Sequence, residues 1–174
     1  MDWMLTRSPP TSWASAARSE VVVTTLSLEA AQAVPVEKVT ESIGRVFGAG
    51  VTIDSVRVDS TEVFRISKEG TLLGFAEVRN VKGKERPITY LVAVDTAGAT
   101  RDIDILVYRE SQGGEVANEA WRKQFRGKSA ADPLQVGKDI RNISGATISS
   151  NAVTRSMRQA LTELAAWRAE GRLP

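Results

Sequence analysis

Apolar residues first fall at helical spacing just after Pro35, a residue that suits the first position of a helix. The glycines of "GAG" at 48–50 predict where this helix ends. A recurrence every three or four positions is typical of one buried helix face. Here that face consists of Val36, Val39, Ile43, Val46 and Phe47.

Residues 51–110 change to a strand pattern, with β-branched residues and roughly alternating polarity. Short polar or glycine-containing turns, "KEG", "VKGKER" and "TAGA", interrupt the pattern at regular spacing. Such spacing predicts an antiparallel sheet of about five strands. The predicted strands are 51–58, 62–67, 71–79, 88–95 and 100–110.

Helical patterns return after the strands. We expect a short helix over 117–128, a loop over 129–139, and a closing helix of about twenty residues. The apolar stripe of the closing helix predicts core packing, and consists of Val153, Met157, Ala160, Leu161 and Leu164. Strands in the middle and helices at the N- and C-terminal ends predict an α+β fold, with the sheet covered on one face.

The N-terminal segment differs in composition from the rest. Residues 1–34 are rich in Ser, Ala, Thr and Pro, and contain a short apolar run followed by "AAQA". We expect them to be a flexible leader or a secretory signal segment. Residues 35–170 are then expected to form one domain.

Composition excludes several classes of chemistry. The 174 residues contain no cysteine and no histidine, which excludes disulfides, Cys/His metal sites, iron–sulfur clusters and a Ser–His–Asp triad. The 23 basic and 21 acidic residues leave a net charge of +2, too balanced to indicate a nucleic-acid partner. Redox chemistry would therefore need an organic cofactor.

The segment "ISGATISSNA" (143–152) gathers small and hydroxylic residues where the closing helix begins. In one interpretation Ser149 or Ser150 caps the helix and Gly145 makes the turn. In the other, free N–H groups at the helix start bind a phosphate, and the small residues leave room for it. The pattern alone favours the first interpretation.

The same residues resemble the signature of the FMN-binding domain family. Its members include the G subunit of the Rnf electron-transport complex and the C subunit of the sodium-pumping NADH:quinone reductase. In the family, a flavin transferase using FAD and magnesium esterifies FMN to the last threonine of a Ser/Thr-Gly-Ala-Thr motif. The resemblance implies FMN as cofactor and Thr147 as its covalent attachment site, with Ser144, Gly145 and Ala146 completing the motif and Ser149 and Ser150 beside it.

The resemblance extends over about residues 38–166. The segment 107–128 is similar to the family's Glu- and Gly-containing loop near the flavin and the short helix after it. The corresponding residues are Glu110, Ser111, Gly113, Gly114, Trp121, Phe125, Gly127 and Lys128. Tyr108 and Trp121 are candidates to line the flavin ring, although aromatic residues beside a sheet are more often core.

One position departs from the family pattern. The transferase's target usually carries aspartate three residues before the Ser/Thr, where this chain has Arg141, and Asp139 lies two residues further back. This substitution leaves two alternatives to covalent attachment: FMN held without an ester, or a fold that has lost its flavin.

The resemblance implies an electron carrier more than a stand-alone enzyme. It implies a flavin transferase and a redox partner that carries haem or flavin or reduces quinone, and that is membrane-bound in some cases. It also implies an extracytoplasmic location, in the periplasm or on the outer face of the cell membrane. The alternative is a flavin-free interaction or sensory module. A hydrolase using Thr147 or a serine is disfavoured, because no base is visible for the nucleophile.

Overall fold

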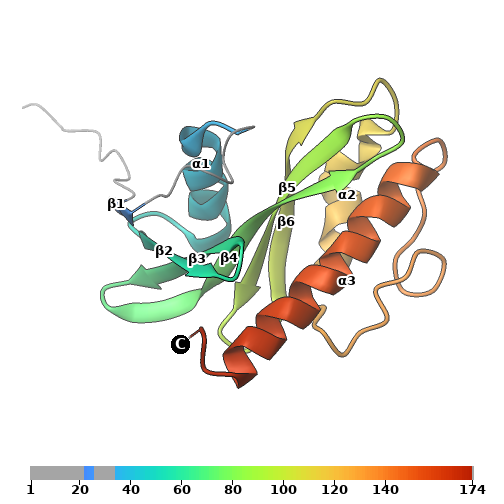
Figure 1. The fold of residues 1–174 in the computed structure, drawn as a ribbon. Coiled ribbons are helices and arrows are strands. Elements are labelled where there is room, and N and C mark those ends of the chain that lie inside the picture. The colour runs from blue at the N-terminus through green and yellow to red at the C-terminus, as the bar shows by residue number, and fades with distance from the viewer. Residues whose placement is uncertain (1–21, 26–33, 174) are drawn as a thin grey trace, which may run out of the picture.

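The structure is a computed structural model that describes residues 22–25 and 34–173. Its centre is a sheet with the strand order β1-β2-β3-β4-β5-β6 (Figure 1). The strands are β1 (Val22–Thr25), β2 (Thr52–Val58), β3 (Thr61–Lys68), β4 (Thr71–Lys82), β5 (Pro87–Asp95) and β6 (Thr100–Tyr108). β2 to β6 pair antiparallel in chain order, which confirms the five predicted strands.

β1 adds an edge that was not predicted. It pairs parallel with β2, with Val22 opposite Thr52. The rest of the predicted leader, residues 1–34, lies outside the described residues except for Val34, so that assignment stays a prediction.

The helices are α1 (Val36–Phe47), α2 (Glu119–Arg122) and α3 (Thr147–Ala169), with 3₁₀ turns η1 (Gly114–Ala117) and η2 (Lys123–Phe125). The predicted helix over 117–128 is thus two short pieces, α2 and η2, which follow η1. An α+β fold with helices at both ends is confirmed. Among the described residues, no helix is both long enough and apolar enough to span a bilayer.

The sheet is covered on both faces, so the prediction of one covered face is wrong. β5 shows why, because residues 88–94 are all buried. Tyr90 and Val92 belong to the core under α3, while Leu91 and Ala93 belong to the core under α1. A strand apolar at every position is buried on both sides. Figure 1 shows α1 and α3 on opposite sides of the twisted sheet.

The segment between β6 and α3 is fixed to the sheet. The Thr100 N–H donates to the Lys128 carbonyl (2.7 Å), and the Gly127 N–H donates to the Thr100 carbonyl (2.8 Å). Trp121 and Phe125 pack edge to face, with ring centroids 5.0 Å apart, in the core under α3. These contacts hold the chain that leads into α3 and so place the start of that helix.

Candidate functional site

α3 begins at Thr147, earlier than the capping interpretation required. Ala146 occupies the N-cap position, and no side chain caps the helix. Ser149 and Ser150 lie within the first turn and are buried, so the interpretation of either as the cap is wrong. Gly145 has a φ of +83°, a left-handed conformation that glycine adopts without strain and that turns the chain into the helix.

The first turn of α3 keeps its backbone donors free. The amides of Thr147, Ile148 and Ser149 form no hydrogen bond among the described residues. The turn also contains no acidic residue to neutralise the positive end of the helix dipole. Free donors and positive potential together are what a phosphate needs, so these residues fit the phosphate group of FMN.

The Thr147 side chain is exposed, and its hydroxyl is held by a neighbour. The Asn142 side-chain amide donates to Thr147 Oγ1 at 2.9 Å. The Asn151 side-chain amide donates to the Thr147 carbonyl, also at 2.9 Å. Because Asn142 uses a lone pair of the hydroxyl oxygen, it fixes that oxygen and leaves the O–H proton directed elsewhere. The sequence contained no signal for this contact.

Two neighbouring cavities meet at the motif. One, of about 250 Å³, is lined by Thr147, Ile148 and Glu110 among others. The other, of about 770 Å³, shares Ser111, Gln112 and Gly145 with it. The structure therefore brings the Ser-Gly-Ala-Thr motif (144–147) and the Glu/Gly loop (110–114) together at one site, as their resemblance implied.

Ile148 gives this site an apolar edge. It is the one large hydrophobic side chain exposed among the described residues, at 52%. An exposed isoleucine directly after Thr147 offers apolar surface to a planar ring or to a protein partner.

Glu110 is anchored where the Glu/Gly loop leaves β6. Its Oε1 accepts hydrogen bonds from the backbone N–H groups of Glu85 (2.8 Å) and Arg86 (3.0 Å). These two bonds lower the pKa of the Glu110 carboxyl, so the group is an anion at neutral pH. Glu110 thus ties the turn after β4 to the loop while facing the smaller cavity.

Tyr108 links the Glu/Gly loop to α3. Its hydroxyl donates to the Gln112 carbonyl and lies 2.9 Å from Ser149 Oγ, which completes the link as donor. Burial raises the pKa of Tyr108, so the hydroxyl keeps its proton. Gly113 has no room for a side chain, because a Cβ there would lie 2.6 Å from the Tyr108 hydroxyl. The loop and the helix start therefore form one bonded unit.

Several predicted site residues are not brought to these cavities. Trp121 is 4% exposed in the core, where its Nε1–H donates to the Arg141 carbonyl at 2.9 Å. Ser150 is fully buried, and its hydroxyl forms no hydrogen bond among the described residues. Ser144 is exposed and lines neither cavity. Phe125 lies in the core with Trp121.

Asp139 does not replace the missing aspartate of the family pattern. Its two oxygens accept the N–H groups of Leu134 (3.1 Å) and Gln135 (2.8 Å), and Lys128 pairs with it at 3.0 Å. Burial opposes ionisation, but these partners outweigh it and lower the pKa of Asp139. Arg141 has an exposed side chain, while its backbone N–H donates to Gln124 Oε1 at 2.8 Å.

Comparison with known proteins bears on the same residues. Residues 83–162 match the model of the FMN-binding domain. The chain is 28% identical to the G subunit of the Na⁺-translocating ferredoxin:NAD⁺ oxidoreductase complex of Acetobacterium woodii, over 83% of this chain and 70% of that protein. It is 35% identical to the G subunit of the proton-translocating ferredoxin:NAD⁺ oxidoreductase complex of Clostridium ljungdahlii, over 48% of this chain and 49% of that protein.

A solved structure is also similar. The crystal structure of Shewanella oneidensis NqrC matches with a TM-score of 0.48 and 22% sequence identity, over 56% of this chain and 54% of that one. The chain thus spans about half the length of this structure and of the second relative. The family model and the two relatives support the family indicated by the motifs: residues 83–162 are similar to an FMN-binding domain, and FMN is the cofactor that this match indicates.

Proposed function

We propose that Thr147 carries FMN through a phosphoester and that the domain relays electrons between redox partners. The observation that carries the proposal is the start of α3, where an exposed threonine hydroxyl stands on a helix whose first three N–H groups have no partner among the described residues. A phosphate bonded to this oxygen lies next to those donors. A helix start closed by a side-chain cap would not offer these donors to a ligand.

In the proposed attachment reaction, FAD is the donor of the FMN group. Thr147 Oγ1 forms a bond to the phosphorus on the FMN side of FAD, and the bond between the two phosphoryl groups breaks. AMP leaves, and the hydroxyl proton is released to solvent or to a base of the transferase. Asn142 holds the attacking oxygen through a hydrogen bond, and this orients the hydroxyl toward the incoming phosphoryl group.

The residues around Thr147 then have distinct tasks. The free amides of the first turn stabilise the phosphate charge. Tyr108 and Ser149 hold the Glu/Gly loop against the helix, so the cavity wall keeps its shape. The flavin supplies the one- or two-electron chemistry when bound, and the chain supplies orientation and electrostatics.

The partners follow from the relatives. Both are named as G subunits of ferredoxin:NAD⁺ oxidoreductase complexes. We propose that this chain likewise exchanges electrons with a partner protein that carries haem or flavin or reduces quinone. We also propose an extracytoplasmic location, because the family's transferase acts there. Fractionation of native cells tests this, and recovery of the flavin-bearing chain only in the cytoplasm contradicts it.

One observation favours a second function. Arg141 stands where the transferase's target usually has aspartate, and Asp139 is fully engaged in its own loop. A chain that the transferase no longer modifies would be an interaction or sensory module with the same fold.

Co-expression with an exported flavin transferase separates these functions. Covalent attachment predicts a fluorescent band after SDS denaturation, which disappears in Thr147→Ala and persists in Thr147→Ser. A dark band on a native protein that is yellow would leave the carrier role without the ester. A dark band on a colourless native protein would favour the flavin-free module.

A further inference from the structure

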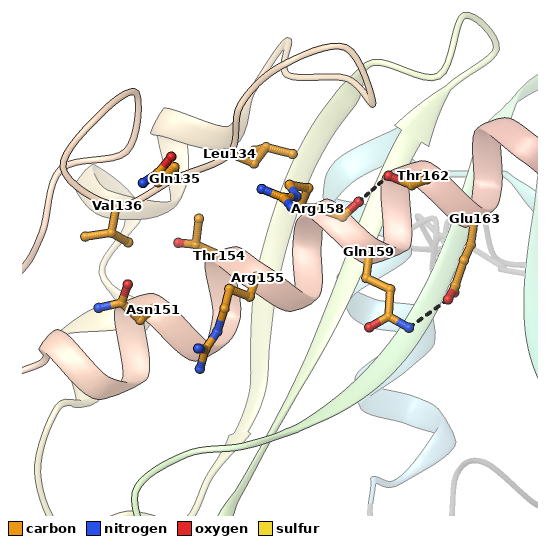
Figure 2. Close-up of a pocket in the computed structure, with 10 residues that line it drawn as sticks. All are labelled: Leu134, Gln135, Val136, Asn151, Thr154, Arg155, Arg158, Gln159, Thr162 and Glu163. Carbon is orange, nitrogen blue, oxygen red and sulfur yellow. Dashed lines mark hydrogen bonds between the residues drawn. The ribbon is translucent and has the colours of Figure 1, made fainter.

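A third cavity lies further along α3, away from the flavin site. It has a volume of about 690 Å³ and is bounded on one side by residues 134–136. The other side is formed by polar side chains of α3 (Figure 2). We call this cavity the helix groove. It shares no lining residue with the two cavities at Thr147.

Two arginines in the helix groove have no partner. The side chains of Arg155 and Arg158 are exposed and form no hydrogen bond or ion pair among the described residues. Figure 2 shows Arg158 extending toward Leu134. By contrast, six other arginines among the described residues form ion pairs with carboxylates: Arg45, Arg65, Arg79, Arg122, Arg126 and Arg172.

The one carboxylate that lines the helix groove is already engaged. Glu163 accepts from Arg79, and its other oxygen accepts from the Gln159 side-chain amide at 2.8 Å. The groove therefore has a net positive charge and lacks an internal counterion. Arginine guanidinium groups bind carboxylates through two parallel hydrogen bonds, so a carboxylate ligand fits this charge.

The remaining lining favours a peptide over a lipid surface. Side-chain amides of Gln135, Asn151 and Gln159 can both donate to and accept from an extended backbone. The groove is concave, and the one large apolar side chain exposed among the described residues, Ile148, does not line it. A membrane-binding face would combine its cations with apolar side chains that enter the bilayer.

We propose that the helix groove binds an acidic segment of a partner protein. Asn151 begins the groove and contacts the Thr147 carbonyl, so the groove starts one helical turn from the attachment site. Arg155 and Arg158 follow Thr147 by about 12 and 17 Å along the helix axis. The role of this contact in electron transfer rests on the proposed function, whereas peptide binding itself does not require flavin.

The test uses the full-length chain purified without a flavin transferase. The probe is fluorescein-labelled hexaglutamate, and binding is followed by fluorescence anisotropy at low salt, with labelled hexaglutamine as the neutral control. The double variant Arg155→Gln/Arg158→Gln should bind hexaglutamate about tenfold more weakly, since two exposed ion pairs are lost. Its melting temperature should lie close to that of wild type, because neither side chain has a hydrogen bond or ion pair to lose among the described residues.

The matched control also removes two positive charges, but at positions outside the helix groove. Lys68 donates to the Ala49 carbonyl and Arg101 stacks on Phe47, both remote from the helix groove. Lys68→Gln/Arg101→Gln should leave hexaglutamate affinity within about twofold of wild type. An equal loss in both double variants would show attraction by net charge alone and overturn the proposal.

Phosphatidylglycerol vesicles test the alternative ligand, an anionic lipid surface. If vesicles retain wild type but not Arg155→Gln/Arg158→Gln, while hexaglutamate binds neither, the groove binds lipid and the peptide proposal is wrong. Because the chain is made without a transferase, Thr147 carries no ester in these samples, and the outcomes do not depend on covalent attachment.

Discussion

The first turn of α3 and the rest of the same helix are built in opposite ways. In the first turn, Thr147 and Ile148 are exposed and the backbone amides have no partner among the described residues. Further along, Val153, Met157 and Leu161 are at most 2% exposed. There the Ser156 hydroxyl accepts a hydrogen bond from Tyr90 at 2.7 Å.

This contrast separates stability from function within one element. The middle and end of α3 bury an apolar stripe against β4 and β5, and hydrophobic burial of this kind holds domains together. The first turn contributes little apolar burial, since its buried side chains are serines, and it keeps backbone donors available. Groups left unsatisfied at a surface are available to a ligand, so substitutions in the two parts should affect different measurements.

The largest expected effect is on stability. Met157 is fully buried, and Met157→Ala should lower the free energy of unfolding by about 2–5 kcal/mol because it opens a cavity. Urea denaturation measures this, with Met157→Leu as a control that should cost less than about 1.5 kcal/mol. If folded Met157→Ala protein lost flavin attachment, the first turn of α3 would not be independent of the packed part of the helix.

The next effect concerns Asp139, which holds Leu134 and Gln135 beside the helix groove. Its pKa is below the ordinary value of 3.8, so its contribution is present above that pH and is lost as pH falls further. Asp139→Asn should cost about 1–3 kcal/mol at pH 7, from weakened bonds to a charged acceptor. Urea denaturation at pH 7 and pH 3 should show this difference shrinking at the lower pH. A constant difference would contradict the assigned ionisation.

A smaller effect distinguishes two asparagines that both contact Thr147. Asn142 donates to the hydroxyl and Asn151 donates to the carbonyl. Asn142→Ala should slow flavin attachment about fivefold, the equivalent of one hydrogen bond of ~1 kcal/mol. Asn151→Ala is the matched control and should leave the rate nearly unchanged. In-gel fluorescence over time measures both, and equal rates for the two variants would remove Asn142 from the site.

The smallest expected effect is a gain in stability. Ser150 has a buried hydroxyl without a hydrogen bond among the described residues, so Ser150→Ala should raise stability by up to about 1 kcal/mol. FMN attachment should be unchanged, because Ser150 lines neither cavity at Thr147. Thermal melts and in-gel fluorescence test the two parts. Reduced attachment in Ser150→Ala would restore it as a phosphate ligand.

Much of the fold could be predicted because it is recorded in local patterns. Alternating polarity and turn spacing placed all five antiparallel strands within a few residues. The second covered face was missed, although residues 90–94 of β5 ("YLVAV") form a continuous hydrophobic run, which is itself the signal of a strand buried on both sides. Pairing of Val22–Thr25 with β2 depends on contacts across about thirty residues, which no local pattern records.

The candidate site was predictable only where a motif recorded it. Thr147 and Glu110 line the cavity as the motifs implied, but Ser150 does not. Ser150 is fully buried against the core instead, and a hydroxyl in a motif does not by itself record whether its side chain meets a cavity or neighbouring protein atoms. Tyr108 reaches Ser149 across 41 residues of sequence, and that approach exists only in the folded chain.

Covalent attachment at Thr147 is tested by the intact mass of the chain after co-expression with a flavin transferase. We predict an added mass equal to FMN less one water, located by peptide fragmentation on Thr147 and absent from Thr147→Ala. An unmodified Thr147 in protein made beside an active transferase, or a flavin ester found on Ser144 instead, would contradict this prediction.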